Sequence, residues 1–286
     1  MAKYAMVIDV ARCTACYSCF VACKDEYWDN DYPPYTAGQP RHGQFWMDLT
    51  KKEQGAYPYI RVTYMPWPCM HCQNPSCLKA AKDGAIYKKR NGIVVIDPEK
   101  AVGQKQVVDA CPYGAIYWNP ARKLPQKCTF CAHLLDKGWK EPRCVESCPT
   151  KALVFGDLND PHSEISRIIA TAKGKLEVLH PEYGLMPKVQ YIGIPKRFIA
   201  GEVVFRDKKD ECAAGVKVTL SSKGEADKVA KTDNYGDFEF EGLDADKDYT
   251  ILIEHGGYSA KKVKVRTNID TYLGEILLSK TTARNE

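Results

Sequence analysis

The sequence predicts an α+β domain over residues 1–198, followed by an all-β domain over residues 199–286. The first domain is indicated by its cysteines, because twelve of the chain's thirteen lie between residues 13 and 148. The second is indicated by short alternating strands after residue 200, with turn signals such as Gly256-Gly257 between them. Cys212 is the one cysteine in that region, and we interpret it as a spectator thiol in a loop.

The first cysteine motif has the spacing C-x2-C-x2-C-x3-C and comprises Cys13, Cys16, Cys19 and Cys23. This spacing is typical of the bacterial ferredoxin loop around a 4Fe–4S cluster, in which the fourth cysteine ligates a second cluster. A disulfide framework is disfavoured because the chain is long and the number of cysteines is odd. Zinc is disfavoured because zinc sites use separate pairs of cysteines, whereas a run of four cysteines at these intervals is typical of iron–sulfur clusters.

Three further segments repeat parts of this pattern. The second motif keeps three cysteines, with Ala81 in the fourth place: Cys69, Cys72 and Cys77. The third keeps only its last cysteine, Cys111, and has other residues in the first three places: Ala101, Gln104 and Val107. The fourth motif is complete: Cys128, Cys131, Cys144 and Cys148.

Counting ligands selects one way of pairing the four motifs. If the first pairs with the fourth and the second with the third, crossed ligation gives three complete cysteine sets. These sets are Cys13, Cys16, Cys19 and Cys148; Cys23, Cys128, Cys131 and Cys144; and Cys69, Cys72, Cys77 and Cys111. The remaining set would be Ala81, Ala101, Gln104 and Val107, none of which is a cluster ligand. We therefore expect three 4Fe–4S clusters and a vacated fourth site; purely local ligation would use the same twelve cysteines.

The rest of the first domain is less regular. We expect a strand over residues 5–10 and long loops over the aromatic insertion 26–68, with a strand near 60–64. Asp160-Pro161 predicts a capped helix with proline in its first turn, and residues 189–194 a short strand. In a ferredoxin-like pair the two clusters lie side by side, and the vacated site is the partner of the Cys69 cluster. We therefore also expect the Cys69 cluster to be isolated from the other two.

The charge of the chain does not indicate nucleic-acid binding. The net charge is +5, but residues 1–199 hold 27 basic and 19 acidic side chains, a local excess of eight. An oxidised cubane with four thiolates carries a formal charge of about −2, and a bound centre enters the charge count. Three cubanes would cancel about six of these eight charges, so the basic residues are interpreted as counter-charge.

With these residues in view, the chain resembles the iron–sulfur subunits of the molybdopterin oxidoreductases of the DMSO-reductase family. The similar segments are Cys-Pro-Tyr-Gly-Ala-Ile at 111–116, Gln-Lys-Cys-Thr-Phe-Cys-Ala-His at 126–133 and Phe-Gly-Asp-Leu-Asn-Asp-Pro at 155–161. The resemblance covers about residues 3–195 and implies two ferredoxin-like modules. Segment 232–240 resembles a carboxypeptidase-regulatory or transthyretin-like sandwich. Three clusters followed by such a sandwich are more narrowly similar to the small subunits of pyrogallol–phloroglucinol transhydroxylases and resorcinol-type hydroxylases.

The resemblance implies an electron-transfer subunit, with molybdopterin (bis-MGD) and the active site in a large partner subunit. It also implies a heterodimer or a higher oligomer of heterodimers. The chain itself shows no hydrolytic triad, P-loop or dinucleotide fingerprint, so we assign it no catalytic residue. Alternatives are a subunit of a respiratory reductase or dehydrogenase, and a free-standing polyferredoxin.

The sequence gives no sign of membrane insertion or export by this chain. No run approaches the roughly 18 apolar residues of a membrane span. Residues 1–10 are too short, and too interrupted by Lys3 and Asp9, for a secretory signal. We expect a cytoplasmic location, or a periplasmic one if a signal-bearing partner carries the folded subunit out.

Overall fold

The computed structural model describes residues 2–172, 174–208 and 211–281, in two compact units. Unit 1 comprises Met1–Lys51 and Tyr64–Ile194, and unit 2 comprises Lys52–Thr63 and Pro195–Glu286. Segment 52–63 therefore groups with the C-terminal region, which a division of the chain at residue 198 did not anticipate. None of the helices in the described ranges has the length and apolar character that crossing a membrane requires.

The central sheet of unit 1 has the strand order β8-β1-β10-β9. Its strands are β1 (Tyr4–Asp9), β8 (Leu153–Asp157), β9 (Leu176–Glu177) and β10 (Val189–Ile192). The predicted strand near the N-terminus is thus β1, which pairs antiparallel with β8 and parallel with β10. Side chains alternate between the two faces of a strand. Met6 and Ile8 accordingly join the core that contains the cysteines, whereas Ala5 and Val7 pack with Ile165 of α6.

Helix α6 (Glu164–Thr171) begins later than the sequence motif indicated. Its N-cap is Ser163, whose hydroxyl accepts a hydrogen bond from the Ser166 amide. Pro161 lies in the preceding turn, not in the first helical turn. Serine can satisfy a free amide at a helix start, and this local bond sets the boundary.

Short elements surround the cysteine loops of unit 1. The helices are η1 (Val10–Arg12), α1 (Ser18–Tyr27), α2 (Ser76–Ala80), α3 (Gln106–Asp109), α4 (Ala132–Leu135), α5 (Arg143–Glu146) and η2 (Pro181–Tyr183). Two hairpins follow the second and third motifs: β4 (Ile86–Lys88) with β5 (Val94–Ile96), and β6 (Tyr117–Asn119) with β7 (Leu124–Gln126). The first of these hairpins is the one that the sequence runs at 84–87 and 92–97 predict after a ferredoxin loop.

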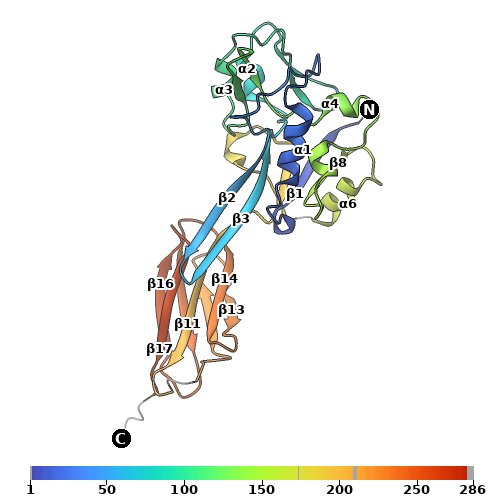
Figure 1. Cartoon of the computed structure of the whole chain (residues 1–286). Helices are drawn as coiled ribbons and strands as arrows, with labels where there is room; N and C mark the ends of the chain where they lie inside the picture. Colours follow the sequence, from blue (N-terminus) through green and yellow to red (C-terminus); the bar gives the residue numbers. More distant parts are fainter. Residues whose placement is uncertain (1, 173, 209–210, 282–286) are drawn as a thin grey trace, which may run out of the picture. The chain divides into compact units, whose positions relative to one another are not determined.

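The aromatic insertion contains a long hairpin where the sequence indicated mostly irregular loops. Strands β2 (Met47–Ala56) and β3 (Tyr59–Pro68) pair with each other as a two-stranded sheet (Figure 1). Within unit 2, the tip of this hairpin packs on the sandwich, where Tyr59 stacks on Tyr272 with ring centroids 4.8 Å apart. Tertiary packing of this kind stabilises strands that have weak periodicity of their own.

The C-terminal region is a β-sandwich, as the strand spacing predicted. One sheet has the order β14-β11-β17 and the other β13-β12-β15-β16. The strands are β11 (Arg197–Phe205), β12 (Lys217–Ser221), β13 (Lys228–Lys231), β14 (Asp237–Leu243), β15 (Asp248–Glu254), β16 (Lys261–Arg266) and β17 (Thr271–Leu278). Side chains from both sheets, such as Val203, Val218 and Ile251, form a separate apolar core. Strand β13 is the one that the sequence pattern did not reveal.

Candidate metal centre

The first group of cysteines lies where the N-terminal loop meets the end of the fourth motif. Cys13 and Cys16 precede α1, Cys19 lies on its first turn, and Cys148 follows α5. Burial raises the pKa of the Cys19 thiol to about 12, and the nearby Cys148 and Cys13 thiolates add to this increase. The structure therefore brings together residues that are 135 positions apart in the sequence. Cys16 is exposed, and hydrogen bonds from Ser18 lower the pKa of its thiol.

The second group is buried in the core of unit 1. Cys23 lies on α1, Cys144 lies on α5, and Cys128 and Cys131 lie between β7 and α4. Burial raises the pKa of the Cys23 thiol well above its ordinary value, and the Cys128 and Cys131 thiolates raise it further. Burial also raises the pKa of Cys144, with additions from the other three thiolates of the group.

The third group lines a small cavity. Cys69 and Cys72 follow β3, Cys77 lies on α2, and Cys111 follows α3. Burial raises the pKa of Cys72 to about 12, with additions from Cys69, Cys111 and Cys77. His71, Val94 and Tyr113 are among the other residues that line the cavity.

The thiol electrostatics link the Cys23 group to each of the other two groups. The Cys19 thiolate raises the pKa of both Cys23 and Cys144, after burial and closer thiolates. On the other side, burial raises the pKa of Cys128 to about 12, and the next largest cause is the Cys69 thiolate. The Cys69 group therefore has the Cys23 group as a neighbour, and the expectation that its cluster is isolated stays a prediction.

The loops that carry the cysteines contain strained backbone. Five non-glycine residues in them have φ between +42° and +60°: Ala15, Tyr17, His71, Phe130 and Cys131. The left-handed region costs about 1 kcal/mol or more per such residue, and this strain persists only where the surroundings fix it. Left-handed residues turn the backbone sharply, as a short loop must do to surround a bound cluster.

The donor set fits iron–sulfur clusters. Each group offers four thiols, and thiolates are the usual ligands of a 4Fe–4S cluster, which transfers single electrons. Among the described residues, no three His, Cys, Asp or Glu side chains converge around a single point as they would around one metal ion. Such convergence belongs to mononuclear sites, whereas a cubane binds each thiolate through a different iron.

Two buried basic side chains lie between the second and third groups. The Lys127 ammonium, on a residue only 2% exposed, donates hydrogen bonds to the carbonyls of Val94 and Cys128. His71 accepts a hydrogen bond at Nδ1 from the Val94 amide and stacks on Phe130. Burial lowers the pKa of His71 well below its ordinary value, and the charge of Lys127 lowers it further. From the sequence, His71 is expected to hydrogen-bond or pack and not to act as a ligand, because each group already has four cysteines. Lys127 is expected from the sequence to be a solvated lysine, and the structure buries it instead.

The positions of the missing fourth set are filled by packed side chains. Ala101 and Val107 are fully buried in a core that also contains Cys77. The Gln104 amide oxygen accepts from the Lys82 amide, and its nitrogen donates to the carbonyls of Lys82 and Lys100. Protein atoms therefore satisfy the polar groups at this place.

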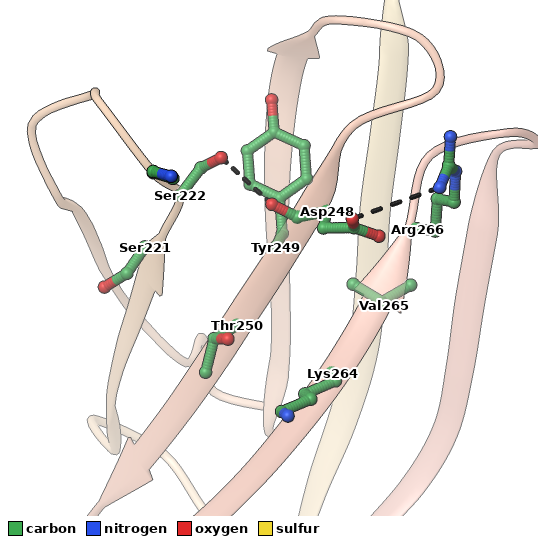
Figure 2. A pocket seen from close by; sticks show the side chains of 9 residues that line it. Ser221, Ser222, Asp248, Tyr249, Thr250, Lys264, Val265 and Arg266 are labelled. Atoms are coloured by element: carbon green, nitrogen blue, oxygen red, sulfur yellow. Dashed lines mark hydrogen bonds and ion pairs between the residues drawn. The ribbon is translucent and has the colours of Figure 1, made fainter.

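A second hollow lies on the sandwich, over β12, β15 and β16 (Figure 2). The Ser222 hydroxyl donates to the Asp248 carbonyl at 2.9 Å, and Arg266 lies 4.0 Å from the Asp248 carboxylate. The Ser222 hydroxyl and the Arg266 guanidinium thus both contact Asp248, and the described residues of this hollow include no group of three or more His, Cys, Asp or Glu side chains that could hold a metal ion.

Comparison with known proteins agrees with this geometry. Residues 60–158 match the model of the "4Fe-4S dicluster domain", and residues 198–279 match the "BOS complex subunit NOMO1-like, second beta sandwich domain". A tetrathionate reductase subunit of Salmonella typhimurium is 36% identical over 69% of this chain and 75% of its own length. The arsenate respiratory reductase iron-sulfur subunit of a Shewanella species is 31% identical over 66% of this chain and 96% of its own length.

The fold and the cysteine groups define an iron–sulfur protein of the subunit type that serves molybdopterin enzymes, and the predicted resemblance is confirmed. A third relative extends through the sandwich: the "Pyrogallol hydroxytransferase small subunit" of Pelobacter acidigallici is 39% identical over 97% of this chain and its own entire length. The chain belongs to the family of this small subunit.

Proposed function

We propose that the chain holds three 4Fe–4S clusters within residues 1–198, and that the sandwich of residues 199–286 holds none. The cluster ligands are Cys13, Cys16, Cys19 and Cys148; Cys23, Cys128, Cys131 and Cys144; and Cys69, Cys72, Cys77 and Cys111. This proposal is supported by the thiol electrostatics, which link the cysteines within each of these sets. It is also supported by the packed side chains at the fourth position.

The pairing of the motifs into two ferredoxin-like modules is supported by contacts away from the cysteines. Strand β1, before the first motif, pairs with β8, after the fourth, so that Ile8 lies opposite Leu153. The second and third motifs are joined by the Ser76 hydroxyl, which donates to the Ala110 carbonyl at 2.6 Å. These contacts favour crossed ligation, in which each cluster takes its cysteines from both loops of its module.

Metal analysis tests the cluster count. Iron and acid-labile sulfide should each be about twelve per chain, since three cubanes hold four of each. The variant Cys111→Ala should retain about eight of each, because it removes a ligand from one set. The matched control Cys212→Ala removes the exposed cysteine of the sandwich and should retain about twelve. Sixteen irons, or zinc in place of iron, would refute the assignment.

We infer that the chain transfers electrons within a heteromeric enzyme whose large subunit carries molybdopterin and the substrate site. The observation that carries this inference is the near full-length similarity to the pyrogallol hydroxytransferase small subunit, which includes the sandwich. The most specific function that this supports is transfer of a hydroxyl group between trihydroxybenzenes. Such a transfer exchanges a hydroxyl between two phenols and requires no net export of electrons.

The alternative is an electron-transfer subunit of a respiratory reductase or dehydrogenase, and the similarity to the tetrathionate reductase and arsenate respiratory reductase subunits favours it. Purification of the native complex, followed by incubation with pyrogallol, separates the two. A transhydroxylase should convert pyrogallol when a second polyhydroxylated benzene is supplied as the hydroxyl donor, without an added electron acceptor or donor. A respiratory enzyme should require a redox dye and should copurify with a membrane subunit, whereas a free-standing polyferredoxin should purify alone. A cytoplasmic location and an oligomer of heterodimers stay predictions.

A further inference from the structure

His71 lies inside the loop that carries the third cysteine group, between Cys69 and Cys72. Its side chain is fully buried, with 0% exposure. The backbone at His71 has φ of 42°, a left-handed conformation that a non-glycine residue adopts at a cost. Its ring is held on one side by Phe130, with ring centroids 3.8 Å apart and planes inclined by 26°. The chain therefore fixes the position of this imidazole closely.

The hydrogen bond from the Val94 amide determines which nitrogen carries the proton. The Val94 N–H donates to Nδ1 at 3.1 Å, so Nδ1 must present its lone pair. An imidazole with a free lone pair on one nitrogen is neutral, and it carries its single proton on the other nitrogen. The proton of His71 therefore lies on Nε2.

The Nε2–H group is buried and has no hydrogen-bond partner among the described protein atoms. A buried donor without an acceptor costs about 1–3 kcal/mol, and such groups are rare in folded proteins. His71 lines the cavity whose wall contains all four cysteines of the third group. A sulfur-rich centre in that cavity would supply the acceptor that the protein lacks.

We propose that His71 donates a hydrogen bond from Nε2 to a sulfur of the cluster held by Cys69, Cys72, Cys77 and Cys111, and thereby raises the reduction potential of that cluster. This rests on the proposed function, since it requires a cluster in that group. Hydrogen bonds to sulfur offset the negative charge that reduction adds, so they favour the reduced state. His71 is thus a positioning and tuning residue, not a ligand.

The wild-type complex offers a test that needs no substitution. In the partly reduced complex, labelled with ¹⁵N-histidine, pulsed EPR should show one cluster coupled to a histidine nitrogen and to a proton that exchanges in D₂O. Absence of both couplings in protein that contains about twelve irons would overturn the inference and leave the cluster count intact. Fewer irons in the wild type would instead refute the proposed function.

Substitution supplies the second test. His71→Phe keeps the stacking surface but removes the donor, whereas His71→Gln retains an N–H at a similar reach. In His71→Phe, the reduced-to-oxidised ratio of one cluster at a fixed potential should fall about tenfold, equivalent to about 59 mV for a one-electron couple. His71→Gln should restore part of this loss, and the exposed His162→Gln control should change nothing. Unchanged potentials in His71→Phe, or equal shifts of all three clusters, would overturn the inference.

Discussion

Replacement of Lys127 by methionine should lower the reduction potentials of two clusters at once. Lys127 is buried, and no ion pair to a carboxylate is found for it in the described residues. Burial raises the pKa of Cys77 to about 11 and that of Cys128 to about 12, and the Lys127 charge opposes both increases. These cysteines belong to different groups. The ammonium therefore interacts with the third and second groups together, and it acts as a shared counter-charge.

The size of the effect follows from Coulomb's law. An opposite charge shifts a titration noticeably within about 6 Å. At that distance, with an effective dielectric constant of about 20, a unit charge contributes about 3 kcal/mol. Solvent and structural relaxation reduce this value. A loss of about 1.4 kcal/mol, or about 59 mV for a one-electron couple, is a conservative expectation for each of the two clusters.

Potentiometric titration of the holo-complex, monitored by EPR, measures this effect. Lys24→Met is the matched control, because the Lys24 ammonium is bound by Gln39, Pro40 and Gln44 and interacts with the Cys23 thiolate. Lys127→Met should lower two midpoint potentials, and Lys24→Met should lower only one. If Lys127→Met retained about twelve irons and shifted no potential, or shifted the Cys13 cluster most, the shared counter-charge would be refuted.

Three further predictions concern the scaffold. Asp270→Ala should destabilise the sandwich by about 2–4 kcal/mol, because its buried carboxylate accepts from Gln54, Arg197 and the Phe198 amide; hydrogen exchange of β11 measures this loss, and the exposed Asp248→Ala should change it by less than about 0.5 kcal/mol. Gln104→Ala should cost about 1–3 kcal/mol and expose the Lys82 amide to exchange, with the iron content unchanged. Chelation of iron should unfold unit 1 but leave exchange in the sandwich core unchanged, since no cysteine belongs to that core; loss of protection in β15 would contradict this independence.

The sequence was most informative where chemistry imposes spacing. The intervals among Cys13, Cys16 and Cys19 follow from the geometry of a cluster loop, so they could be recognised without a structure. The sandwich could be predicted because its strands alternate and its turns contain glycine. The hairpin β2–β3 could not, because part of what stabilises its tip is packing against Tyr272, which is remote from it in the sequence. Burial of His71 and Lys127 was equally hidden, since local sequence does not show which side chains a fold encloses.

The order of the cysteine groups leads to a last prediction about magnetic coupling. The Cys23 group interacts electrostatically with both others, through Cys19 on one side and through Cys128 and Cys69 on the other. Ala101 and Val107, at two positions of the missing fourth set, share a core with Cys77 of the third group. In the proposed three-cluster arrangement, the absent fourth cluster would lie beside the third group, so its loss leaves the links of the Cys23 group to the other two groups in place. Stepwise reduction followed by EPR should show the middle cluster spin-coupled to each neighbour, with no direct coupling between the outer two. An uncoupled third cluster would refute this order.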